Sequence, residues 1–146
     1  LSSYKEPVIV TGCDGVGTKT EILFELDMVE TAGKDLVAMN VNDILTTGGD
    51  PLLFLDYLGI SNLERERSRI TRLVAGMCDY LESCNCILAG GETAEMPGVV
   101  QESIVELSGF CIGFHFLIAS DSFSIHLQDY METDMIRKHL HHQYSP

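Results

Sequence analysis

Residues 8–19 read Val-Ile-Val-Thr-Gly-Cys-Asp-Gly-Val-Gly-Thr-Lys: a β-branched run, a glycine-rich turn with one aspartate, and a lysine where a helix is expected to begin. Gly15 and Gly17 let the backbone approach a ligand closely, and the free amides of a helix start favour an anion. Thr18 and Glu21 have the spacing of a capping box for that helix. Because a bare aspartate would repel phosphate, the stretch predicts a phosphate site that works through a metal ion. An ordinary turn is the alternative interpretation.

Two well-known phosphate-binding motifs do not fit this stretch. A P-loop ends in Gly-Lys-Ser or Gly-Lys-Thr, whereas this chain reads Gly17-Thr18-Lys19, with the lysine and the hydroxyl exchanged. The Rossmann motif needs a third glycine at the position of Thr20. The stretch is therefore neither a P-loop nor a Rossmann turn.

The composition of the chain limits its class and its partners. Its 146 residues, 45% of them hydrophobic, can bury the core of one domain. The 22 acidic and 9 basic residues give a formal charge of -13, which argues against nucleic acid as a partner and favours divalent cations. No apolar stretch reaches the roughly twenty residues of a membrane helix, and the start does not resemble a secretion signal. We therefore expect a cytoplasmic protein without a membrane partner.

Helical spacing predicts a helix that starts near residues 34–35, after a break at Gly33, and has a polar stripe beside its apolar face. The stripe consists of Asn40, Asp43 and Thr47, at positions i, i+3 and i+7. Such a stripe faces either a site or water, and helical spacing alone does not decide between them.

Residues 52–58 form a nearly continuous apolar run, which predicts a strand covered on both faces. Asp56 interrupts this run, and a buried carboxylate needs donors or a partner, so it either caps a backbone or lies at a subunit contact. Ser61 and Glu64 then form a capping box, and apolar residues recur at helical spacing over 70–81.

A second glycine-rich segment, residues 90–98, follows a short buried strand and predicts a turn that presents Glu92. Glu92, Asp14 and Asp43 are three acids that could converge on one metal-bound phosphate. Hard divalent cations take such oxygen ligands. A last strand is predicted over 104–113, running through a glycine that permits a bend or a close neighbour.

Four motifs, one of them in two parts at 35–39 and 41–45, carry a resemblance to a known family. They are Asp-Gly-Val-Gly-Thr-Lys at 14–19, Asp-Leu-Val-Ala-Met at 35–39, Val-Asn-Asp-Ile-Leu at 41–45, Phe-Leu-Asp-Tyr at 54–57, and Gly-Gly-Glu-Thr-Ala-Glu-Met-Pro-Gly at 90–98. In this order, over residues 7–113, they resemble aminoimidazole ribonucleotide synthetase, also called phosphoribosylformylglycinamidine cyclo-ligase.

The resemblance implies an α+β fold and a ligase activity. The amino-terminal domain of this type has a mixed or antiparallel sheet with helices on one face, and it pairs across a homodimer into a barrel. ATP lies in a cleft shared with a second domain. The implied reaction is the ATP-dependent cyclisation of formylglycinamidine ribonucleotide to aminoimidazole ribonucleotide in de novo purine biosynthesis, with release of ADP and phosphate.

The resemblance also implies the residues of the site. Asp14 and Asp43 would be catalytic and would hold Mg²⁺ and the ATP phosphates, with Glu92 beside them as a third metal ligand. The remaining ATP-binding residues would be Gly15, Gly17, Thr18, Lys19, Gly90 and Gly91.

The resemblance covers only part of the chain. It implies an ATP-binding and dimerisation domain over residues 1–113, incomplete at its amino end, and a divergent tail over 114–146 that contains a histidine-rich tract. We therefore expect the ATP-binding half of a cyclo-ligase that is inactive in isolation. A non-catalytic dimerisation or ATP-binding fragment is one alternative, and a related ATP-dependent kinase, for selenophosphate or thiamine phosphate, is another.

Overall fold

Seven elements follow one another in the computed structural model, which describes residues 7–116. They are β1 (Pro7–Gly15), α1 (Lys19–Glu25), α2 (Val29–Thr46), β2 (Asp50–Ile60), α3 (Leu63–Ser83), β3 (Ile87–Glu95) and β4 (Val105–Phe116). Among these described helices, none is both long enough and apolar enough to cross a membrane. Residues 117–146 of the predicted tail, including its histidine-rich tract, lie outside the described residues.

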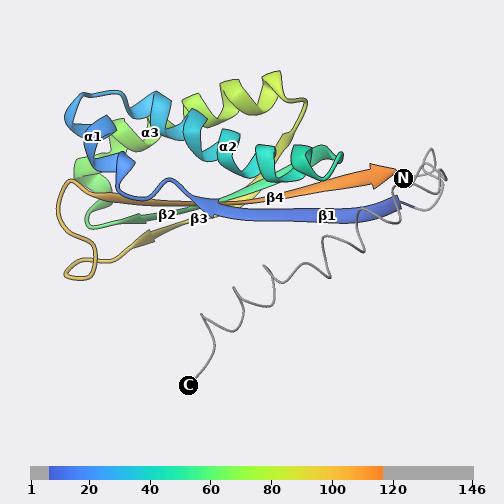
Figure 1. The fold of residues 1–146 in the computed structure, drawn as a ribbon. Helices are drawn as coiled ribbons and strands as arrows, with labels where there is room; N and C mark the ends of the chain where they lie inside the picture. The colour runs from blue at the N-terminus through green and yellow to red at the C-terminus, as the bar shows by residue number, and fades with distance from the viewer. Residues whose placement is uncertain (1–6, 117–146) are drawn as a thin grey trace. The chain divides into compact units, whose positions relative to one another are not determined.

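The four strands form one mixed sheet in the order β1-β4-β2-β3. β2 runs antiparallel to β4 and parallel to β3. A parallel pair needs a long crossover, and α3 supplies it between β2 and β3. The helices lie together on one face of the sheet (Figure 1). The α+β class, the mixed sheet and the helices on one face are thereby confirmed.

The core lies between the sheet and the helices. On β2, the alternating side chains of Phe54, Leu58 and Ile60 are at most 1% exposed and point toward the helices. Leu55 points to the other face and is 37% exposed. The prediction that residues 52–58 are covered on both faces is therefore wrong for this chain. The alternation was hidden in the sequence because the residues on the open face are apolar as well.

The prediction that Gly33 breaks the helical pattern is wrong. Gly33 is buried inside α2, where this helix crosses α3. A Cβ atom on Gly33 would collide with the carbonyl oxygen of Leu73, and one on Gly76 of α3 would collide with that of Glu30. The two glycines allow the helix backbones to touch. This packing outweighs the low helix propensity of glycine, so α2 begins already at Val29.

The two predicted capping boxes are not formed. The cap of α3 is Asn62 rather than Ser61, and its side chain accepts a hydrogen bond of 3.0 Å from the backbone N–H three residues later. Thr18 does cap α1, but its side chain makes no capping bond. Instead, the Thr20 hydroxyl donates to the carbonyl oxygen of Gly17 at 2.8 Å.

Both glycine-rich motifs continue a strand where a turn was predicted. β1 runs through Asp14 to Gly15, and the chain turns only at Gly17, which has a φ of +67°. β3 includes Gly90, Gly91 and Glu92, with a register shift opposite Phe54/Leu55. Glycine is depleted in strands, but pairing with a neighbouring strand outweighs this low strand propensity here.

Candidate functional site

α2 packs on β1, and this contact places Asp43 over the strand that carries Asp14. The contact is made at Gly12, which is buried. A Cβ atom on Gly12 would lie 2.7 Å from the Asp43 Cβ and 3.0 Å from its Oδ2. The side chain of Asp43 therefore lies directly over the strand, two residues before Asp14. The structure thus places Asp43 on the helix-facing side of β1, two residues along the strand from Asp14.

Asn40 connects the same two elements. Its side chain is fully buried, and its Oδ1 accepts a hydrogen bond of 2.9 Å from the backbone N–H of Asp14. Its Nδ2 donates to the carbonyl oxygens of Asp14, at 3.3 Å, and Leu36, at 2.9 Å. The sequence placed Asn40 in a polar stripe with Asp43, but it did not decide whether this stripe faces a binding site or solvent. Its neighbour at i+3, Asp43, was the only signal of a role.

The glycine-rich stretch shapes the end of β1. One carboxylate oxygen of Asp14, Oδ1, accepts a hydrogen bond of 2.7 Å from the backbone N–H of Gly15. Gly15 itself lies against β4, where a Cβ atom would be 3.0 Å from the carbonyl oxygen of Leu107. Gly17 is exposed in the following turn, and a Cβ atom there would meet nothing within 4 Å. Only the backbone conformation of Gly17, not crowding, therefore favours glycine.

Lys19 is already engaged with another residue of the chain. Its Nζ forms an ion pair of 2.8 Å with Oδ2 of Asp35 on α2, and its side chain is 50% exposed. The predicted contact between Lys19 and a nucleotide would require this ammonium to be shared with the phosphates or to leave Asp35.

Glu92 lies far from Asp14 and Asp43 within the chain. β3, which carries Glu92, and β1 are the two edges of the sheet, with β4 and β2 between them. Three strand spacings amount to roughly 14 Å. Glu92 also pairs with Tyr57, which is on the open face, whereas Asp14 faces the helices. Within residues 7–116, no group of three or more Asp, Glu, His or Cys side chains is arranged to hold a metal ion.

Asp56 lies between two glycines on the helix-facing side of the sheet. Its partners in the neighbouring strands are Gly91 and Gly109. A Cβ atom on Gly91 would collide with the Asp56 carboxylate, and one on Gly109 would lie 2.6 Å from both the Asn40 Nδ2 and the Phe54 ring. Burial raises the pKa of the Asp56 carboxyl, and a backbone hydrogen bond opposes that shift. Because Gly91 and Gly109 have no side chain, there is room for the side chains of Asp56 and Asn40.

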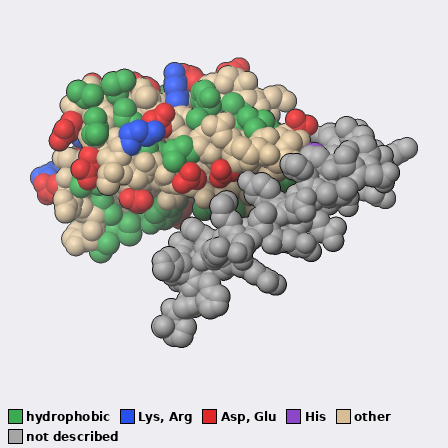
Figure 2. Space-filling view, viewed as in Figure 1, with side chains coloured by type: hydrophobic (Ala, Val, Ile, Leu, Met, Phe, Trp, Pro, Cys, Tyr) green, Lys and Arg blue, Asp and Glu red, His purple; other side chains and the backbone are tan. Residues whose placement is uncertain are grey.

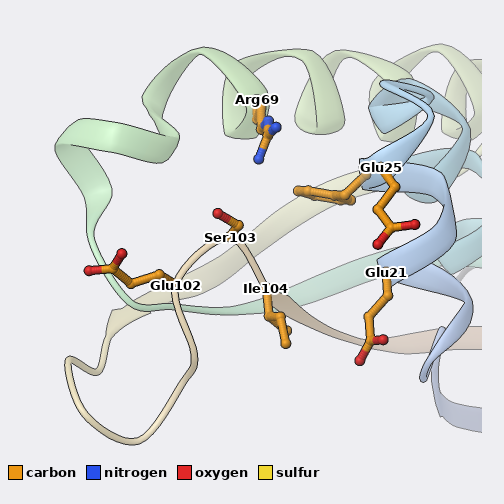
Figure 3. Close-up of a pocket in the computed structure, with 7 residues that line it drawn as sticks. Glu21, Glu25, Arg69, Glu102, Ser103 and Ile104 are labelled. Atoms are coloured by element: carbon orange, nitrogen blue, oxygen red, sulfur yellow. The ribbon is translucent and has the colours of Figure 1, made fainter.

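A cavity of about 260 Å³ lies elsewhere, between α1, α3 and the loop before β4 (Figure 3). Arg69 extends from α3 toward this cavity, with its guanidinium 5.8 Å from the centre of the Phe24 ring. The cavity contains none of the predicted site residues. Its lining consists of Glu21, Phe24, Glu25, Arg69, Glu102, Ser103 and Ile104.

Residues 4–115 of the chain match the family described as "AIR synthase related protein, N-terminal domain". This segment includes the carboxylates on β1 and α2. The chain belongs to this AIR synthase related family. The match covers the whole sheet up to His115 and every residue that was predicted to form the site.

Curated relatives within the AIR synthase related family are about 50% identical to this chain over the aligned segment. The phosphoribosylformylglycinamidine cyclo-ligase of Picosynechococcus sp. is 50% identical over 112 residues, which cover 77% of this chain and 32% of that protein. The protein of the same name from Clostridium novyi is 50% identical over 113 residues, which cover 77% and 34%. The chain therefore spans about a third of the length of the curated relatives it matches.

Solved structures share the AIR synthase related fold at lower sequence identity. Thiamine monophosphate kinase from Aquifex aeolicus matches 74% of this chain and 34% of its own, with a TM-score of 0.58 and 22% identity. PurL of T. maritima, complexed with AMPPCP, matches 75% of this chain and 17% of its own, with a TM-score of 0.60 and 16% identity. These likenesses show the fold.

Proposed function

We propose that this chain is the ATP-binding part of a phosphoribosylformylglycinamidine cyclo-ligase of purine biosynthesis. The observation that carries the proposal is the 50% identity to a protein of that name over 112 residues. The proposed reaction is the ATP-dependent cyclisation of formylglycinamidine ribonucleotide to aminoimidazole ribonucleotide, in the cytoplasm. The kinase alternative has weaker support, because the thiamine monophosphate kinase is only 22% identical.

In this proposal, Asp14 and Asp43 hold Mg²⁺ together with the ATP phosphates. Proteins commonly bind Mg²⁺ through one or two carboxylates plus substrate phosphates, so two adjacent aspartates suit this ion without a third acid. When bound, the metal neutralises charge on the phosphates during phosphoryl transfer. The backbone of Gly15 and Gly17 and the start of α1 at Thr18 would border the same phosphates.

We propose a contribution of Lys19 only if its ion pair with Asp35 opens or is shared. Within one chain, Glu92 lies on the opposite face and edge of the sheet from Asp14. A contribution of Glu92, with Gly90 and Gly91, would therefore require a second copy of the chain that reaches the helix-facing side of β1 at Asp14. This assignment connects the site to the proposed homodimer.

The proposed homodimer would form on the face of the sheet opposite the helices. On this face, Ile9 is 64% exposed, Ile87 is 60% exposed and Leu55 is 37% exposed. On the side of the molecule seen in Figure 2, acidic side chains are scattered among apolar and other side chains. An apolar face bounded by polar surface is typical of a protein interface.

Catalysis is to be tested in a chimera, because the chain spans about a third of the relatives' length and the rest of that length would supply other walls of the site. Residues 4–115 of this chain replace the matching segment of the Picosynechococcus protein. We expect ADP release that depends on formylglycinamidine ribonucleotide, and a loss of about a hundredfold in Asp43→Asn, because removing one electrostatic stabiliser of a transition state costs about that much.

Asp79→Asn in α3, an exposed aspartate, is the matched control and should retain the activity of the chimera. A folded chimera without substrate-dependent ADP release would contradict the proposal. If the isolated 146-residue chain binds Mg²⁺ and ATP but releases no ADP, the alternative of a non-catalytic ATP-binding fragment describes the chain by itself.

A further inference from the structure

Asn40 is a fully buried polar side chain whose hydrogen bonds are all made to backbone. Asparagine is mostly exposed in proteins, and buried polar groups are retained when they are satisfied. Two of its three bonds go to one residue, Asp14, whose N–H and C=O are both held. The amide orientation follows from this pairing, since a flipped amide would place its NH₂ group against the Asp14 N–H.

The strand that Asn40 holds has few other constraints. Among the described strands, β1 is an edge strand that pairs with β4 alone. Asp14 lies near its end, just before the turn at Gly17. The bonds from α2 replace part of the support that a second neighbouring strand would provide. Without them, the end of β1 could move relative to the helix.

Asn40 also lies one helical turn before Asp43. Its bonds therefore link the backbone of one proposed metal ligand to the helix that carries the other. Gly109 makes this possible, because a side chain there would occupy the position of the Asn40 amide. Separations between ligands must be held to within about half an ångström for a site to function.

We propose that Asn40 is a positioning residue that sets the separation of Asp14 and Asp43. This inference rests on the proposed function, because it assigns to Asn40 a role in Mg²⁺ and ATP binding beyond its role in stability. Asn40 does not touch the nucleotide in this proposal; it acts through the backbone of Asp14.

The test measures Mg²⁺-ATP affinity and stability separately on the 146-residue chain. Isothermal titration calorimetry at 25 °C gives the Kd of the Asn40→Leu variant for Mg²⁺-ATP. Leucine has about the same size as asparagine but makes none of its hydrogen bonds. Thermal unfolding without ligand gives its stability. The matched control is Asn42→Leu, on the exposed side of α2. We expect a Kd about tenfold weaker for Asn40→Leu and a Kd within twofold of the original chain for Asn42→Leu.

Asn40→Ser is measured in the same way in case Asn40→Leu does not fold. The smaller side chain leaves room for a water molecule to satisfy Asp14 while the direct link is lost. An unchanged Kd in a folded Asn40 variant, even with a lowered Tm, would show a structural role only and overturn this inference alone. Absence of Mg²⁺-ATP binding by the original chain would overturn both the inference and the proposed site.

Discussion

Gly33 and Gly76 have no side chain at the point where α2 and α3 cross, and this single property decides how closely the two helices pack. A Cβ atom at either position would collide with a carbonyl oxygen of the other helix. A backbone oxygen cannot move aside as the end of a flexible side chain can. The two glycines are therefore required for packing, not for a turn.

We expect Gly76→Ala to lower the free energy of unfolding by about 1–3 kcal/mol, because overpacking a close contact forces the backbone to shift. Helix propensity alone predicts the opposite, a gain of about 1 kcal/mol. Urea denaturation measures the difference. Ser68→Ala, at an exposed position of α3, is the control in which propensity acts by itself. A Gly76→Ala chain as stable as the original would contradict the crossing that we describe.

Among the elements, α3 is tied by one arginine to the turn before α2 and to the first turn of α2 itself. Arg72 donates to both carboxylate oxygens of Glu30, at 2.6 and 2.8 Å, and to Oδ1 of Asp27 at 2.7 Å. It also donates to the Asp27 carbonyl oxygen at 3.0 Å, at a residue whose φ is +54°. The Arg72 side chain is 36% exposed, so solvent screens these ion pairs.

The hydrogen bond from Arg72 lowers the pKa of Glu30. The folded chain therefore binds this proton less tightly than the unfolded chain, and acid favours unfolding. We expect the contribution of Glu30 to stability to be complete above the ordinary glutamate pKa of about 4.3 and to be lost as the pH falls through its lower value in the folded chain. Urea midpoints between pH 7 and pH 3 measure this loss.

Arg72→Gln should show a weaker decline of stability over the acid range than the original chain, because Glu30 then has no guanidinium partner. Other carboxylates titrate in both proteins, so the difference between the two curves isolates this interaction. Arg67→Gln, an exposed arginine on the same helix, is the matched control. Parallel pH curves for Arg72→Gln and the original chain would count against the role of this ion pair.

At the scale of the whole molecule, the main feature of residues 7–116 is a sheet whose helices lie on one face. Antiparallel and mixed sheets can leave one face in water, and alternating polar residues then usually cover it. Here that face presents apolar side chains on β1, β2 and β3, including Ile9, Leu55 and Ile87. The proposed homodimer would bury this surface.

We expect the chain to have twice its monomer mass of 16.1 kDa by light scattering at micromolar concentration. Leu55→Glu should shift it to the monomer mass, because the interface would bury an unpaired charge. Ile22→Glu, at a residue of α1 that is 59% exposed on the helix side, should remain dimeric. A monomeric original chain would contradict the homodimer and, with it, the proposed contribution of Glu92 from a second copy.

Several features of the fold could be predicted because they depend on local chemistry. The apolar spacing over 70–81 correctly predicted α3. The prediction for Gly109, a glycine that permits a close neighbour, is confirmed by its contact with Asn40. Each of these inferences concerns a residue and neighbours that are near in sequence, or the space that a missing side chain leaves.

The sequence by itself determined the mixed α+β class, the order of the elements and the motifs shared with the AIR synthase related family. Only the tertiary structure decided that Asn40 is buried against Asp14, that Gly33 lies inside a helix, and that Glu92 is at the other edge of the sheet from Asp14. Strand order and face depend on pairings between distant segments. Periodicity describes one segment at a time, so it cannot state which distant segments become neighbours.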